Sequence, residues 1–226
     1  MCIRDRNEWK DEIPAEVFTE TFTPPITDGS GNDRKNLLKA KEILEKEGWF
    51  VEDGKLVKDG KEFKFEFLIV SPSDEKIALA YQSNLKKLGI TMDVRTVDSS
   101  QYQERLLSYD FDMIKRYWGV SLSPGNEQQF YWGSEVGQKD GSRNYPGINS
   151  PAVDALIEKL ISATNREELT TAIHALDRVL LWGHYVVPLY HSNKDRIAYW
   201  DFFEYPDEIP LYGIVIESWW INKDKQ

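Results

Sequence analysis

The sequence predicts an α/β fold, a mixed sheet with helices packed on it. Segments in which every second residue is apolar, as in strands, alternate with segments whose apolar residues recur every three or four positions, as in helices. Glycines and Asp-Gly pairs separate these segments. The 226 residues, of which 41% are hydrophobic, suffice for one compact domain and are marginal for two.

The first part of the chain predicts one helix and one short strand. Residues 7–32 are rich in Pro, Thr and Gly, so we expect 1–29 to be an irregular lead-in. Asp33 is placed to cap a helix that runs to Lys46, where leucines and isoleucine recur at helical spacing before Gly48. Two Asp-Gly turns then enclose a short strand over 55–57.

The most regular region follows, with strands and helices in alternation. Phenylalanines alternate with Glu and Lys in its first strand, a serine and a glycine bound its first helix, and alternation returns in the second strand. This order builds a sheet with packed helices. In chain order, the elements are expected over 63–69, from Ser71 or Ser73 to 88, over 90–95, over 102–107 and over 111–118.

The last hundred residues predict a long loop, two helices and two strands. Residues 119–150 show hardly any periodicity, and a loop of that length in a compact domain is usually functional. Ser150-Pro151 is typical of a helix start, and Asn165 with Glu168 of another. Strands are expected over 185–190 and 214–217, although no preceding element is an obvious partner for the tail.

Composition excludes several classes of function. The net charge is −10 without a basic stripe, so nucleic acid is not an expected partner. The single Cys2 excludes an internal disulfide and a multi-thiolate metal site, and the three histidines are scattered, so we expect no metal. No nucleophile elbow, dinucleotide-binding fingerprint or Walker loop occurs, and we expect no cofactor. Asp110 and Asp112 lie two apart, as in a hydrolytic pair, but solvated carboxylates at a strand start explain them more simply.

The sequence contains no apolar run long enough for a transmembrane helix and no signal peptide at its start. Residues 1–6 resemble a string found at the ends of proteins translated from assembled sequencing reads. We therefore expect the natural N-terminus, and any signal sequence, to be missing from this chain.

Residues 117–134 are the candidate binding segment. They combine broad aromatic faces, small residues that allow close backbone approach, and uncharged donors and acceptors. This mixture suits a site that holds an extended polar ligand by its main chain and stacks on its side chains. The simpler alternative is a surface loop pinned by its aromatic residues.

Several motifs together resemble the extracellular solute-binding proteins of family 5, the peptide- and nickel-type receptors of ABC importers. Each motif alone is weak, but their joint order over about residues 33–220 is specific. The segments around Ser121, Trp182 and Arg196 look most like the branch that imports oligopeptides and microcin C. The motifs are Leu37 to Trp49, Leu85 to Ile90, Tyr109 to Met113, Gly141 to Asn149, Pro151 to Ile157 and Ala175 to Trp182.

The resemblance implies a two-lobed receptor of the type II, cluster C periplasmic-binding-protein fold. Such a receptor closes over its ligand and delivers it to the permease subunits of the importer, without catalysis. By this template, residues 30–196 are the ligand-binding second lobe, and 197–226 return to a first lobe that is largely missing from this chain. A monomeric, periplasmic or lipid-anchored protein is implied.

The resemblance also implies which residues touch the ligand. Many peptide-binding members carry an aspartate three residues after the tryptophan that follows the third strand, and it pairs with the peptide's amino terminus. Here Ser121 takes that place, so either another acid such as Glu127 replaces it or the ligand's end is held differently. The expected ligand-contacting residues are Trp118, Gly119, Ser121, Ser123, Asn126 and Asn144.

Two other classes of function stay open on the sequence. A carbohydrate-binding or glycan-hydrolysing domain would use the exposed-looking aromatic residues and the Asp110/Asp112 pair. A hydrolase would need two carboxyl groups about 5 to 9.5 Å apart across a cleft. The third possibility is an interaction domain whose aromatic residues all lie in the core.

Overall fold

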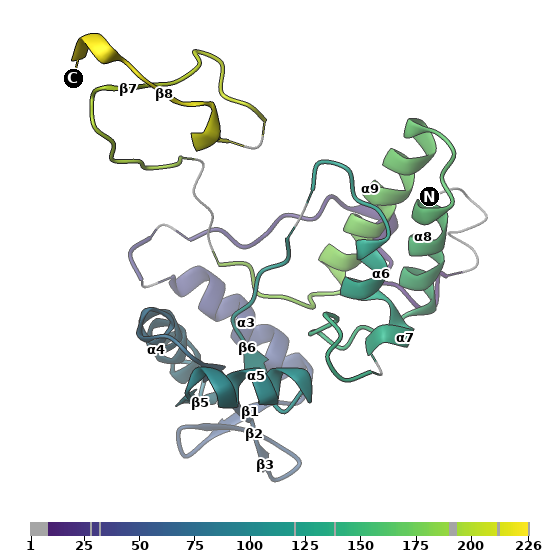
Figure 1. The fold of residues 1–226 in the computed structure, drawn as a ribbon. Helices are drawn as coiled ribbons and strands as arrows, with labels where there is room; N and C mark the ends of the chain where they lie inside the picture. Colours follow the sequence, from purple (N-terminus) through teal and green to yellow (C-terminus); the bar gives the residue numbers. More distant parts are fainter. Residues whose placement is uncertain are drawn as a thin grey trace. The chain divides into compact units, whose positions relative to one another are not determined.

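The computed structural model of the protein describes residues 9–27, 29–31, 33–119, 121–137, 139–189, 194–211 and 213–225. The chain divides into two compact units, Met1–Tyr185 and Val186–Gln226 (Figure 1). Each unit has its own secondary structure.

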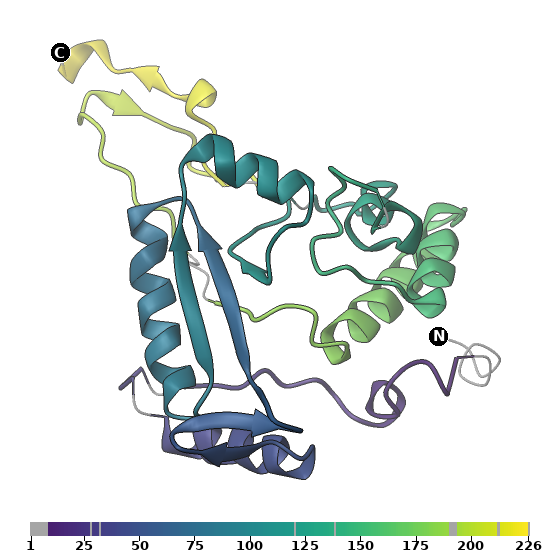
Figure 2. The same ribbon diagram turned by 90° about the horizontal axis from the view of Figure 1, so that it is seen from below.

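A three-stranded parallel sheet organises the first unit. β4 (Lys64–Ile69) lies between β5 (Thr91–Thr96) and β6 (Met113–Ile114), and both pairings are parallel. The connections are α4 (Pro72–Lys86) and α5 (Ser99–Leu107), and Figure 2 shows α4 lying along the sheet. The Ser71 hydroxyl caps α4 by accepting from the Ser73 amide.

A small antiparallel sheet precedes the parallel one. α3 (Arg34–Lys46) leads into β1 (Phe50–Glu52), β2 (Lys55–Lys58) and β3 (Lys61–Glu62), which pair in that order. Both Asp-Gly turns between the strands have positive φ at each residue, which explains the glycines. Parallel and antiparallel pairings are therefore divided between two sheets, and the predicted α/β class is confirmed.

A helical cluster completes the first unit. α8 (Pro151–Ile161) and α9 (Arg166–Trp182) pack against each other, and α2 (Glu16–Thr19), α6 (Glu127–Trp132) and α7 (Ser134–Gly137) lie around them (Figure 1). The Asn165 side chain caps α9 by accepting from the Glu168 amide. The lead-in contributes Ile13 and Val17 to this core, so the described part of it, residues 9–27, is less irregular than expected for 1–29. The buried side chains of α8 and α9 are Ala152, Val153, Leu156, Ile157, Leu160, Ala172, Ala175, Leu176 and Val179.

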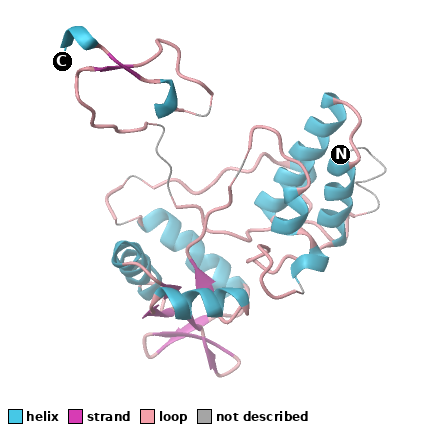
Figure 3. Ribbon diagram, viewed as in Figure 1, coloured by secondary structure: helices cyan, strands magenta, loops and turns pink. Residues whose placement is uncertain are grey.

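The second unit has little regular structure. β7 (Phe203–Glu204) and β8 (Trp220–Ile221) form an antiparallel pair, and η1 (Ile216–Ser218) and η2 (Lys223–Lys225) are single 3₁₀ turns (Figure 3). Its centre is an aromatic cluster. The Trp219 ring centroid lies 4.9 Å from that of Tyr199 and 5.1 Å from that of Tyr205.

Three predicted strands differ from the structure, the first in its extent and the other two entirely. The strand predicted over 111–118 is paired only at Met113 and Ile114, and the residues after it bond to side chains and loops instead. The segment 185–189 forms no ladder, and Pro188 lacks the amide that a central strand would need. Residues 214–217 run into η1 rather than a strand. Alternating apolar residues indicate an extended backbone, but not whether a partner strand is present.

The loop predicted over 119–150 contains α6 and α7. α6 is short and its sequence EQQFYW mixes polar and aromatic residues, so no helical stripe stands out. No helix in the described part of the chain is long and apolar enough to cross a bilayer.

Candidate functional site

The segment that leaves the carboxyl end of β6 is fixed by its tryptophan. The Trp118 indole Nε1 donates to the Arg143 carbonyl at 3.1 Å, so residues 118 and 143 are joined across 25 positions of chain. The Trp118 ring lies 4.9 Å from the Trp132 ring and 6.2 Å from the Tyr145 ring, measured between centroids. Trp118 is half-buried, so part of its indole is available to a ligand.

The next residues form an open polar surface. The Gly119 carbonyl accepts from the buried Tyr131 hydroxyl at 3.1 Å, and a Cβ atom at Gly119 would meet nothing within 4 Å. The Ser121 hydroxyl accepts from the Ser123 amide at 3.1 Å. Gly119, Ser121 and Ser123 are all exposed. This surface can offer hydrogen bonds and close backbone approach to an extended ligand.

The beginning of α6 carries the nearby acid. Asn126 is exposed and its side chain forms no capping hydrogen bond. Glu127 Oε1 accepts from the Gly125 amide at 2.9 Å and from Gln128 Nε2 at 3.2 Å. Burial opposes ionisation of Glu127, but the hydrogen bonds from the backbone amides of Gly125 and Glu127 outweigh it, so the pKa of Glu127 lies below its ordinary value. The carboxylate is therefore charged at neutral pH and also shapes the turn.

Asn144 has a structural role. Its side chain is fully buried at 0% exposure. Nδ2 donates to the Gly133 carbonyl at 3.0 Å and to the Ile148 carbonyl at 2.8 Å, and Oδ1 accepts from the Ile148 amide at 2.9 Å. Because the amide is committed to these three bonds, we leave Asn144 out of the proposed contacts with ligand. It holds residues 144–148 against the end of α6.

Two residues of the site, Arg116 and Tyr145, were not predicted from the sequence. Arg116 Nη2 donates to the Tyr145 hydroxyl at 3.1 Å, and the guanidinium carbon lies 5.1 Å from the centre of the Tyr145 ring. The Tyr109 hydroxyl is hydrogen-bonded to Ser142. The spacing of Arg116 and Trp118, two apart in an extended segment, is the sequence signal that could have placed both on one side.

The structure brings most of the predicted residues together. Trp118 and Gly119 are joined to the segments 131–132 and 141–148 by the contacts above, whereas Glu127 is bonded within its own turn. Ser121 and Ser123 share a turn of the same loop. A cavity of about 610 Å³ lies elsewhere, between α8 and α9, and no aromatic residue lines it. The candidate site is therefore an exposed surface.

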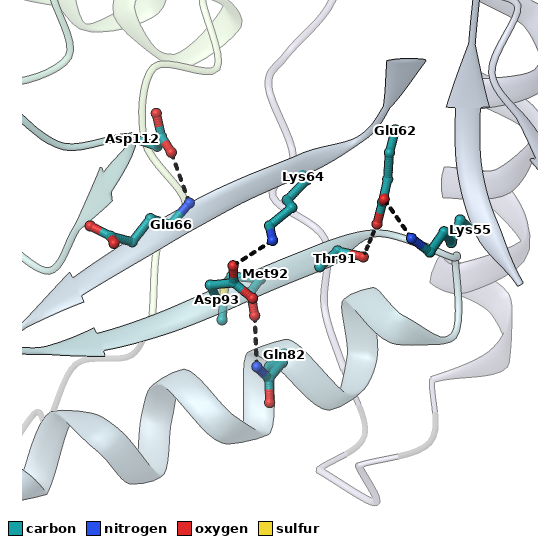
Figure 4. Close-up of polar contacts among 9 residues, drawn as sticks. All are labelled: Lys55, Glu62, Lys64, Glu66, Gln82, Thr91, Met92, Asp93 and Asp112. Atoms are coloured by element: carbon teal, nitrogen blue, oxygen red, sulfur yellow. Dashed lines mark hydrogen bonds and ion pairs between the residues drawn. The ribbon is translucent and has the colours of Figure 1, made fainter. Parts of the chain in front are cut away.

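The two aspartates of the hydrolytic alternative have separate structural bonds. Asp110 Oδ2 accepts from Arg105 Nε at 2.8 Å, and Asp112 Oδ2 accepts from the Glu66 amide of β4 at 2.8 Å (Figure 4). Both therefore stabilise the approach to β6, and nothing in this arrangement favours glycan hydrolysis. The described residues include no group of three or more His, Cys, Asp or Glu placed to hold a metal ion.

Comparisons with known proteins identify the family. The model of the bacterial extracellular solute-binding proteins, family 5 Middle, matches residues 5–140. The uncharacterized protein y4wM of Sinorhizobium fredii is 48% identical over 221 residues, which are 96% of this chain and 33% of that protein. The probable peptide-binding protein YejA of Agrobacterium fabrum is 42% identical over 219 residues, 96% of this chain and 36% of that protein. The chain thus spans about a third of the length of these relatives.

A solved structure shows the same fold. The oligopeptide-binding protein AppA of Bacillus subtilis, solved with a nonapeptide, superposes with a TM-score of 0.60 at 23% identity, covering 80% of this chain and 38% of that protein. The family match extends over more than half of the sequence and agrees with this fold. The chain therefore belongs to the bacterial extracellular solute-binding proteins of family 5.

Proposed function

We propose that this chain forms one wall of the ligand cleft of a peptide receptor that serves an ABC importer. In this proposal residues 30–196 are the second lobe and 197–226 return to the first lobe. The receptor works outside the cytoplasm, in the periplasm or anchored to lipid, as a monomer without catalysis. It hands its ligand to the permease subunits.

The observation that carries the proposal is the anchored loop after β6. Trp118 is held by its hydrogen bond to the Arg143 carbonyl, and the Gly119 carbonyl is held by the Tyr131 hydroxyl. Ser121 and Ser123 in the same loop stay exposed. The proposed ligand contacts are Trp118, which would stack, Gly119, which would let a peptide backbone approach, and Ser121 and Ser123, which would hydrogen-bond. Asn126 is exposed at the edge of this set and is retained.

The proposed ligand is an oligopeptide or a microcin C-like peptide. The name of the Agrobacterium fabrum relative and the peptide bound to the Bacillus subtilis structure support the peptide class. Ser121 gives no charge for a peptide ammonium, so Glu127, which is ionised at neutral pH, is the proposed counter-charge. One of its oxygens is occupied by the Gly125 turn, and the ammonium would approach the other.

The affinity of this chain alone should be weak. A micromolar receptor gains about 8 kcal/mol from both walls, so one wall that supplies half of it binds with a Kd of about 1 mM. Nuclear magnetic resonance detects binding of this strength. We would titrate the 226-residue chain with Ala-Phe-Ala, whose aromatic ring can stack on Trp118, and follow the indole N–H signals of its eight tryptophans.

The decisive variants are Trp118→Ala and Trp118→Phe. Trp118→Ala should weaken binding by about fivefold or more, since stacking of two aromatic rings contributes about 1 kcal/mol beyond the buried area. Trp118→Phe keeps an aromatic face and should retain part of it. Trp200→Ala, which removes a 73% exposed tryptophan from the second unit, is the matched control and should change nothing. Equal affinity in all four proteins, or no shift at the Trp118 indole, would reject this wall as the binding site.

A further inference from the structure

Arg116 is a cation fixed at the edge of the aromatic surface. It leaves β6 two residues after Ile114, and its guanidinium lies over the Tyr145 ring while donating one hydrogen bond to the Tyr145 hydroxyl. The Tyr145 ring is also the neighbour of Trp118. Arg116 and Trp118 therefore flank the same tyrosine.

Arg116 differs from two nearby cations, Lys115 and Arg105, in its ionic partners. Lys115 forms an ion pair with Asp74, and Arg105 forms ion pairs with Glu66 and Asp110. Among the described residues, no ion pair includes the Arg116 guanidinium, which contacts the neutral Tyr145 and also acts electrostatically on Tyr102. Arg143 and Arg166 form no ion pair among these residues either, but only the Arg116 guanidinium is held on an aromatic ring of the candidate site.

The Tyr145 contacts orient the guanidinium and leave donors free for another partner. A guanidinium carries five N–H donors in one plane, and the bond to Tyr145 uses one of them. The aromatic face restricts the rotation of the long side chain, so less entropy is lost when a ligand binds. The side chain is exposed, and so its remaining donors are accessible from solvent. Planar donors of this kind match the two oxygens of a carboxylate.

We infer that Arg116 binds a carboxylate of the ligand and thereby favours peptides with an acidic group next to the residue that stacks on Trp118. This inference rests on the proposed function of the wall. The carboxylate has two sources in a peptide, the free C-terminus and an acidic side chain, and both present the same two oxygens. Arg116 would then be a specificity-determining residue, and Tyr145 would position it.

The first experiment tests the carboxylate site without a peptide. Acetate and its neutral analogue acetamide are titrated separately into the 226-residue chain, and the Arg116 Nε–H signal is followed, assigned by its loss in Arg116→Lys. Acetate should shift this signal and acetamide should not. Arg166, an exposed arginine at the start of α9, is the internal reference and should respond less. Equal responses of the two arginines, or of Arg116 to both probes, would overturn the inference.

The second experiment connects the site with peptide binding. Ala-Phe-Ala is compared with Ala-Phe-Ala-amide for the terminal carboxylate, and Ala-Phe-Glu-amide with Ala-Phe-Gln-amide for the side-chain carboxylate. The acid of at least one pair should bind about fivefold tighter than its neutral partner, and the pair that differs identifies the source. Arg116→Gln should abolish this preference, Arg116→Lys should retain part of it, and the charge-matched control Arg166→Gln should leave it intact.

The two proposals fail in different ways. Peptides that all shift the Trp118 indole with no preference for the acids would overturn the role of Arg116 and support the wall. An acetate response at Arg116 without any peptide binding would support the carboxylate site and reject the peptide function. An acid preference that survives in Arg116→Gln would assign it to another residue and overturn the inference.

Discussion

Replacing Asn144 by alanine should destabilise the protein by about 3 kcal/mol. The substitution deletes three hydrogen bonds of 2.8 to 3.0 Å that join the side chain to the backbone of Gly133 and Ile148. Each such bond contributes about 1 kcal/mol, and the backbone groups left behind are buried and cannot recover a bond to water without rearrangement. The sum is a large share of the stability of an ordinary domain.

Urea unfolding followed by circular dichroism measures this loss. Asn144→Ala should lower the midpoint of the transition without changing its slope, because the surface exposed on unfolding stays the same. Asn149→Ala is the matched control, since Asn149 is exposed and lies on the same loop. A loss below about 1 kcal/mol for Asn144→Ala, or an equal loss for the control, would refute the reasoning that the buried amide holds this loop.

Three further substitutions test other parts of the molecule. Gly89→Ala should lower the free energy of unfolding in urea by more than Gly54→Ala. Both positions have φ of +80°, but only at Gly89 would the new Cβ lie 2.9 Å from the Leu56 amide nitrogen. Equal losses of stability would contradict this. Glu127→Gln should reduce the loss of stability in acid. The pKa of Glu127 is lower in the folded than in the unfolded protein, so its stabilisation is present above the unfolded pKa near 4.5 and is lost as pH falls through the folded pKa. An unchanged pH profile of unfolding would exclude this role. Asp98→Ala should cost about 1 kcal/mol in thermal unfolding, because its carboxylate accepts two amide hydrogen bonds at the start of α5; an unchanged melting temperature would show that this cap contributes nothing.

Local signals in the sequence were sufficient where the structure itself is local. Asp33, Ser71 and Asn165 cap helices as predicted, because a cap depends only on residues within one turn. The strands over 64–69 and 91–96 were also predictable from alternation, since Phe67, Ile69 and Met92 pack into one core, although Leu68 is buried in a second core on the other face of β4. The limits of β6, by contrast, are set by pairing with β4 at two positions, which the alternating sequence 111–118 does not encode.

The candidate site shows the same division. Trp118, Gly119, Ser121 and Ser123 were predicted from residue type and family motif, and the structure leaves each at least partly accessible. Asn144 was predicted in the same way, but an asparagine in the sequence is equally consistent with a ligand contact and with a buried side chain that is hydrogen-bonded to the backbone. Only the packing of the loop around it, with 0% exposure, distinguishes the two roles.

The same packing explains why the proposed binding surface depends on the buried Asn144. Asn144 fixes Ile148 and Gly133, and the neighbouring Arg143 carbonyl accepts the Trp118 indole hydrogen. The orientation of Trp118 is therefore determined by a loop that lies 25 residues later in the sequence. A substitution at Asn144 should disturb Trp118 even where the protein stays folded, because the carbonyl that holds the indole would no longer be fixed. The stability of this loop and the geometry of the proposed wall are thus set by the same hydrogen bonds.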